Sequence, residues 1–330
     1  MITREEFKSI ALNFYHWCNY PAVKYKILFH LLDYKYDDRK LMELRNDFLH
    51  SDIVMQLYDE QLPDGSWGPL RDKDYSCKSI FPTTFVAIER CLYIGLTIED
   101  KDILFMASEY LEEFLQGKSK TKLYNKNERA IPWQMSEIAF YTERIKPNNP
   151  LCDRLWNEWN YIATCAFADG EYSHDRDKRA QHEIFLTRED RLIPIPISLL
   201  LTRSKDLLRN LEDAMVNYYG KNAYLNGYFW DKSLDKFPED FASNKTRRWF
   251  HTIKYINQFR NTKDYLSNAM EWLLSNRDLD GLWDYGSQIK DPWGYYGYFS
   301  TNRKYKYNNK VDCTMEVLNI LKTYIDHNQI

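Results

Sequence analysis

Apolar residues recur at helical spacing along most of the chain, and polar loops separate the periodic stretches. The pattern predicts helices over residues 4–17 and 22–33, followed by a helix that Asp37 and Asp38 cap and that runs to about Leu57. Further periodic stretches predict helices over residues 81–93, 99–114, 132–141, 150–167, 192–202, 206–219, 246–259, 264–274 and 311–325. We therefore expect an all-α protein.

The predicted helices alternate between two kinds of surface. Residues 81–93 are apolar nearly all round, which is typical of a helix buried on every side, whereas residues 99–114 carry one apolar face. Alternation of buried and amphipathic helices indicates an inner and an outer ring. We expect an (α/α)6-type toroid, with residues 1–330 forming a single domain.

A turn made of Asp or Asn, then Gly, then a nearby aromatic residue recurs along the chain. It stands at residues 64–67, 169–172, 226–230 and 280–283. Glycine adopts positive φ without steric cost, and Asp or Asn before it bonds back to the backbone, so each copy predicts a sharp turn.

The glycines of these turns are nearly evenly spaced. Gly170 to Gly227 is 57 residues, Gly227 to Gly281 is 54, and Gly65 to Gly170 is 105, close to twice that interval. Gly117 stands near the missing midpoint, although no aromatic residue follows it. A fixed period of this length predicts an array of helix pairs, ~54 residues each, in which each unit buries its apolar face on its neighbour.

The first turn carries a family resemblance. Gln61, Asp64, Gly65 and Trp67 match the QW repeat of terpenoid cyclases of squalene-hopene cyclase type, and the related α/α toroids of protein prenyltransferase β subunits carry similar turns. Residues 280–283 resemble a second copy, with Asn276 taken as the counterpart of the family's Gln. The resemblance implies that Gln and Trp tie the end of one outer helix to the next turn.

Composition narrows the classes of protein. The 45 basic and 48 acidic residues give a net charge of −3, so we expect no nucleic-acid partner. The longest apolar run, 193–201, is interrupted by Pro194 and Pro196 and is too short for a membrane span, and the charged N-terminal residues are unlike a signal peptide. We expect a cytoplasmic protein without an integral membrane segment.

The six cysteines are scattered, and none forms a CxxC pair. We expect them to be small buried apolar side chains. Aromatic residues make up 16% of the chain. Either an aromatic-lined cavity or a tyrosine-rich surface would account for that share.

Long polar loops precede the predicted inner helices, and in a toroid the helix starts that follow them would meet at one rim. Cationic side chains there, together with helix N-termini, favour an anionic ligand. The candidate ligand-binding residues are Arg191, Lys245, Arg247, Arg248, Lys310, Trp133 and Trp249. The candidate catalytic residues are Asp312, Glu137 and His251.

The resembled cyclases protonate an alkene with a carboxylic acid and use an Asp-x-Asp-Asp motif, which this chain lacks. The nearest cluster, residues 33–38, has Lys35 where an Asp belongs, and no DDxxD motif occurs. Asp312 or Glu137 would have to substitute, although Asp312 also fits a simple helix cap. We expect no metal site: Asp312 and Cys313 lack the spacing of the prenyltransferase zinc ligands, and the cluster from His174 to Glu183 fits a solvated loop.

Three hypotheses of function follow. The first is a terpenoid cyclase- or prenyltransferase-like protein that binds an isoprenoid, or another apolar small molecule, by an anionic head, with no cofactor unless a diphosphate head brings Mg²⁺. The second is a carbohydrate-active enzyme on the same fold, with paired carboxylates. The third is a noncatalytic binding or scaffold protein that keeps the toroid.

Overall fold

The structure is a computed structural model of the 330-residue chain. It describes residues 2–35, 39–71, 81, 83–100, 102–119, 131–185, 194–222, 232–239, 241, 244–286, 299 and 306–328. These residues contain helices and connecting turns and no strand, which confirms the all-α class. The elements are α1 (Arg4–Trp17), α2 (Pro21–Lys26), the π-helical turn η1 (Ile27–Leu31), α3 (Arg39–Leu49), α4 (Asp52–Asp59), α5 (Thr84–Ile94), α6 (Ile103–Leu115), α7 (Ile131–Ile145), the 3₁₀ turn η3 (Pro150–Cys152), α8 (Asp153–Ala166), α9 (His174–Phe185), α10 (Pro194–Thr202), α11 (Arg209–Asn222), α12 (Asn244–Ile256), α13 (Lys263–Ser275) and α14 (Lys306–Asn328).

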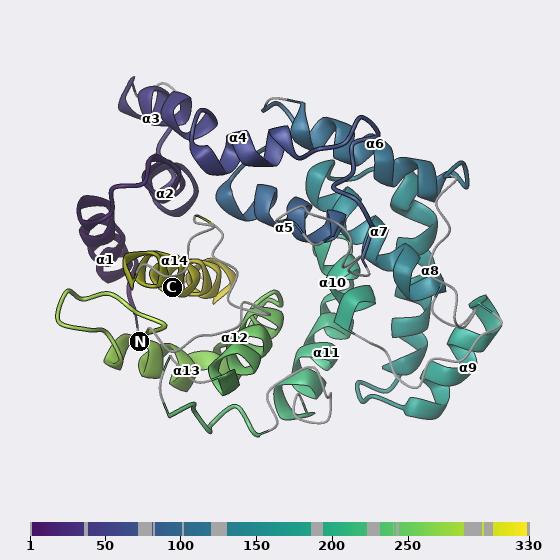
Figure 1. Cartoon of the computed structure of the whole chain (residues 1–330). Coiled ribbons are helices and arrows are strands. Elements are labelled where there is room, and N and C mark those ends of the chain that lie inside the picture. Colours follow the sequence, from purple (N-terminus) through teal and green to yellow (C-terminus); the bar gives the residue numbers. More distant parts are fainter. Residues whose placement is uncertain are drawn as a thin grey trace. The chain divides into compact units, whose positions relative to one another are not determined.

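The chain forms two compact units, and the first unit contains both ends of the chain. It consists of Met1–Val54 and Val216–Ile330. Its central element is α14, which lies among α1, α2, α12 and α13 (Figure 1). Nearly every residue from Asn308 to Leu321 is buried, so α14 forms the core of this unit.

The second unit is the continuous segment Met55–Met215. Its central element is α7, which packs against α6 and α10, while α8 packs against α9 (Figure 1). The apolar sequence of α10 is buried from Ile197 to Leu201. Pro194 and Pro196 stand in the first turn of α10, where a missing N–H leaves no helical hydrogen bond unmade.

Three predictions about the elements were wrong. The helix expected to reach Leu57 is interrupted after Leu49, because the Ser51 hydroxyl bonds Phe48 O at 2.6 Å and α4 starts anew at Asp52. Asp37 and Asp38, its expected cap, lie outside the described residues.

The second error is the solvated loop expected for the cluster from His174 to Glu183, which lies in helix α9, His174–Phe185. Its first turn carries Asp175 and Asp177, which complement the helix dipole, and the helix packs against α8. The third error is the cap at Asp312, which lies inside α14 because that helix begins at Lys306.

Candidate functional site

The turn after α4 is held by both of the residues that define its motif. The indole Nε1 of Trp67 donates to Leu57 O at 2.8 Å, and its backbone N donates to Thr84 Oγ1 at 3.1 Å. The Gln61 amide donates to Gly65 O and to Ile103 O, both at 2.9 Å. The turn therefore connects the end of α4 to the starts of α5 and α6.

The turn after α13 repeats this geometry in the other unit. Trp283 Nε1 donates to Leu273 O at 2.6 Å, again ten residues earlier, and Trp283 N donates to Thr314 Oγ1 at 3.1 Å. The backbone closes in the same way, with Asp278 N on Leu282 O at 2.8 Å where the first turn has Leu62 N on Ser66 O at 2.8 Å. Two turns 216 residues apart thus share the same pattern of hydrogen bonds.

The two turns are backed by different helices. A Cβ on Gly65 would lie 2.2 Å from Met106 O of α6, while Gly281 faces Asn13 of α1, whose side-chain amide donates to Asp280 O at 2.9 Å. Superposing the motifs places Arg277, three residues before Asp280, at the position of Gln61. Arg277, rather than Asn276, is therefore the counterpart of Gln61, and it pairs with Glu6 of α1 at 3.8 Å.

The remaining turns depart from this design. After Gly170, Tyr172 donates its hydroxyl to the buried Asp177 at 2.5 Å, because α9 begins at once and brings that carboxylate within reach. Gly117 has positive φ and ends α6 without an aromatic residue. The turn at residues 226–230 lies outside the described residues.

The first turns of α12 present two cations and one imidazole on one face. Lys245, Arg248 and His251 are exposed and spaced three residues apart, and the first turn of α12 contains no acidic residue. Trp249 points the other way: it is fully buried against Phe237 and Trp272, with ring centroids 6.3 and 4.8 Å away. The exposed face of α12 is therefore a candidate anion-binding surface. The packing of Trp249 on the opposite side fixes the helix in place.

Two side-chain contacts link α12 to α14. Lys254 pairs with Glu316 at 2.8 Å, and the Asn257 amide donates to Ile320 O at 2.8 Å. On both helices the second contact lies about one turn after the first. Lys245, Arg248, His251, Lys310 and Asp312 all belong to the first unit.

On α14 the two predicted site residues are both buried. Lys310 Nζ contacts Asp278 at 2.5 Å and also Asp280, and it lies 5.1 Å from the ring centre of Trp17. Burial lowers the pKa of Lys310, but the two carboxylates outweigh burial and the pKa is raised. Asp312 accepts from Phe299 N at 3.2 Å and is 6% exposed.

In the second unit, Trp133 and Glu137 meet a residue that the sequence analysis overlooked. The Arg71 guanidinium lies 3.4 Å from the ring centre of Trp133, and its Nε lies 3.5 Å from Glu137 Oε2. A guanidinium stabilises the charged form of a carboxylate, whereas an acid that protonates an alkene must be neutral. The contacts of Glu137 and Lys310 therefore favour structural roles.

Some candidates cannot be placed. Arg191 and the side chain of Arg247 lie outside the described residues. Among the described residues, no group of three His, Cys, Asp or Glu side chains could hold a metal ion.

Sequence reasoning also missed Thr84, which with Thr314 attaches the two turns to the buried helices. Thr84 Oγ1 donates to Gly68 O at 3.1 Å and Thr314 Oγ1 donates to Trp283 O at 3.0 Å. For Thr84 the available signal was a threonine at the start of a largely apolar helix.

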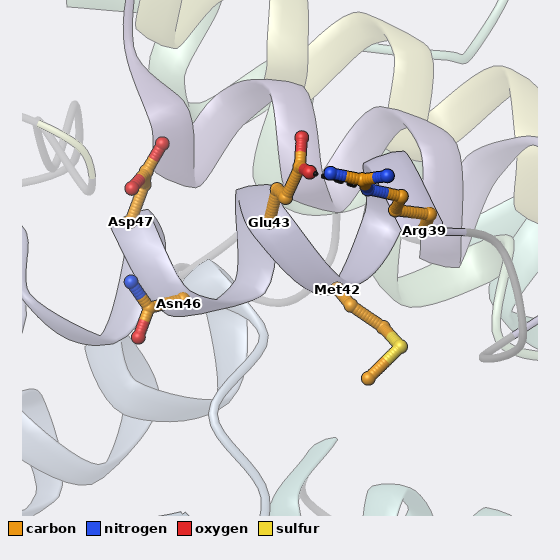
Figure 2. A pocket seen from close by; sticks show the side chains of 5 residues that line it. All are labelled: Arg39, Met42, Glu43, Asn46 and Asp47. Carbon is orange, nitrogen blue, oxygen red and sulfur yellow. Dashed lines mark hydrogen bonds and ion pairs between the residues drawn. The ribbon is translucent and has the colours of Figure 1, made fainter.

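A hollow of about 430 Å³ lies on the exposed face of α3 (Figure 2). The residues that line it are Arg39, Met42, Glu43, Asn46 and Asp47. All come from one helix, and Arg39 pairs with Glu43 at 3.0 Å. This open surface lacks the convergent groups of a ligand site.

The four described buried cysteines, Cys18, Cys91, Cys152 and Cys313, agree with the expectation of small apolar side chains, and Cys165 is half-buried. Burial raises the pKa of the Cys91 and Cys152 thiols, so the thiolate is disfavoured. None of the described helices has the length and the apolar composition of a membrane span.

Comparison of the chain with family models, with curated proteins and with solved structures gives no match.

Proposed function

We propose that the chain is a terpenoid cyclase- or prenyltransferase-like α/α-toroid protein that binds an apolar small molecule through an anionic, diphosphate-like head. The repeated turn supports the architecture. In the second unit the turn at Gly65 lies against α6, the next outer helix of the predicted order; in the first unit the turn at Gly281 lies against α1. A ring of helix pairs requires such a contact between its last turn and its first helix.

The proposed binding site for the anionic head is the exposed face of α12. Lys245 and Arg248, with His251 one turn further along, stand near the start of a 13-residue helix, where the helix dipole adds to the positive field of the two cations. Cations at that end oppose the helix dipole, and a bound anion would relieve that cost. If the head is a diphosphate, Mg²⁺ would enter with the ligand.

Binding is better supported than acid catalysis. Glu137 is paired with Arg71, and Asp312 is nearly inaccessible. Of the predicted acids, Asp312 remains the candidate, because it belongs to the same compact unit as α12.

Titration calorimetry with farnesyl diphosphate tests the proposal, with farnesol and inorganic diphosphate as the separated tail and head. Lys245→Gln combined with Arg248→Gln should weaken binding of farnesyl diphosphate by at least roughly 100-fold, since each of the two charged hydrogen bonds lost contributes about 1.5–3 kcal/mol.

Lys263→Gln provides the matched control, because Lys263 is also an exposed cation in the first turn of a helix, α13. It should leave affinity within about twofold. Equal losses in the control, or no binding of any allylic diphosphate by the unaltered chain, would contradict the proposal.

A further inference from the structure

Two residues of α7 hold the side chain of Arg71 in the second unit. Its guanidinium lies 3.4 Å from the ring centre of Trp133, and its Nε lies 3.5 Å from Glu137 Oε2. At this separation the guanidinium is in direct contact with the face of the indole, on which a planar cation stacks well. The ring and the carboxylate together restrict Arg71 to one orientation.

The backbone that leads to Arg71 is also held. Pro69 O accepts from Thr84 N at 2.8 Å, and Leu70 O accepts from Phe85 N at 3.2 Å. The backbone before Arg71 is therefore attached to the start of α5, while the side chain of Arg71 contacts α7. A side chain that is already positioned in this way loses little further freedom when it binds a ligand.

The two terminal nitrogens of Arg71 remain available to a ligand. Within the described part of the chain, no hydrogen bond engages Nη1 or Nη2, and 41% of the side chain is exposed. Arginine presents these nitrogens as a planar fork, whose parallel N–H groups match two oxygens of a carboxylate or of a phosphoryl group. The contacts of Arg71 thus leave this fork directed to solvent.

The neighbours of the fork favour a carboxylate over a phosphate. Glu137 lies on the Nε side of the same guanidinium. Its charge repels a second anion, and it repels the roughly two charges of a phosphate more strongly than the single charge of a carboxylate. Leu70, Pro132 and Trp133 are half-buried, so they add exposed apolar surface near Arg71.

We propose that Arg71, held by Trp133 and Glu137, binds the carboxylate of a small molecule whose apolar body lies beside Trp133. Glu137 then acts as a positioning residue, in agreement with its ion pair. The site belongs to the second unit, whereas α12 belongs to the first. The inference therefore does not rest on the proposed function, and the binding of farnesyl diphosphate does not bear on it.

Modification of the full chain with phenylglyoxal, followed by peptide mass spectrometry, measures the access of reagent to each arginine. Benzoate serves as the probe carboxylate, at about 20 mM because a single bidentate pair binds weakly, and at constant ionic strength. Benzoate should slow the modification of Arg71 at least about threefold, since it occupies the two terminal nitrogens.

Arg154 is the matched control within the same chain. Its Nε also pairs with a carboxylate, Glu158 Oε1 at 2.8 Å, but its side chain is 85% exposed and contacts no aromatic ring among the described residues. Benzoate should leave its rate of modification unchanged. No protection of Arg71, or equal protection of Arg154, would overturn the site. Protection of Arg71 by inorganic phosphate as strong as that by benzoate would overturn the choice of a carboxylate.

Arg71→Lys tests the fork itself, because it keeps the charge at an exposed position and removes the paired N–H groups. It should weaken the binding of benzoate at least about fivefold in a saturation-transfer NMR titration, with an unchanged thermal midpoint. Arg154→Lys should leave the affinity for benzoate unaltered. Equal affinities in the Arg71→Lys variant and the unaltered chain would show that charge alone binds the probe, and would overturn the proposal.

Discussion

At the scale of the residue, the glycines of the chain differ in what surrounds them. Gly65 and Gly117 both have positive φ, at 86° and 68°. A Cβ on Gly65 would meet the backbone of α6, while a Cβ on Gly117 would meet nothing within 4 Å. Of these two positions, only residue 65 requires glycine both for its positive φ and because no room is left for a Cβ.

Gly65→Ala should therefore destabilise the protein much more than Gly117→Ala. The Gly117 change should cost about 1–2 kcal/mol, the strain of a left-handed conformation, whereas Gly65→Ala adds a clash with Met106 O and should exceed about 3 kcal/mol. Urea unfolding followed by circular dichroism measures both. Equal costs would show that α6 yields to the added methyl group.

A buried and an exposed ion pair give a second contrast at the residue scale. Arg203 pairs with Glu143 and, at 2.7 Å, with Asp153, and the Glu143 side chain is 1% exposed. Arg203→Met would leave that carboxylate buried without its cation and should cost about 3–5 kcal/mol. Arg154→Met removes the exposed partner of Glu158 and should cost less than about 0.5 kcal/mol in the same urea assay. Similar costs would indicate that water reaches Glu143.

At the scale of the element, periodicity predicted those helices whose apolar face is regular. Residues 4–17 were predicted as a helix and form α1 with the same bounds, because Thr3 caps it and its apolar residues face one side. Helix α9 was missed because its sequence is mostly charged, and its support comes from α8 and from the turn before it. The start of α14 was missed for a related reason: contacts of Tyr307 and Asn308 with residues 17–20, nearly 290 positions away, hold a polar segment helical.

The candidate site was less predictable than the helices. Sequence placed Lys245, Arg248 and His251 at a helix start, and the helical spacing then puts them on one face. The sequence could not show that Lys310 pairs with Asp278 and Asp280. That contact depends on how the turn at Gly281 packs against α14.

At the scale of the whole molecule, the contacts between the first and last helices hold the two ends of the chain in one unit. Lys310, Asp278 and Asp280 lie at this junction beside Trp17. Burial pushes the pKa of Asp278 upward, but hydrogen bonds from Lys310 and the turn backbone outweigh it, and the pKa is lowered.

A lowered pKa in the folded state means that Asp278 contributes stability above its unfolded pKa of about 3.9 and loses it as pH falls through the folded value. Asp278→Asn should therefore lower the thermal midpoint at pH 6 and converge with the unaltered chain below about pH 3. Thermal scans between pH 2.5 and roughly pH 7 measure this. Glu109→Gln, at an exposed position of α6, should show no such convergence; a constant difference at every pH for Asp278→Asn would point to lost packing instead.

The first unit is assembled from the two ends of the sequence, whereas Met55–Met215 is continuous. During synthesis α1 therefore emerges long before α14 and the Trp283 turn, the surfaces that cover its apolar side. The continuous unit is therefore fully synthesised before α14, whereas α1 is synthesised before the elements that cover it. Nascent chains arrested near residue 250 should thus carry a protease-resistant centre and an N-terminal segment that is still cleaved, in the reverse of the usual order of folding along a polypeptide.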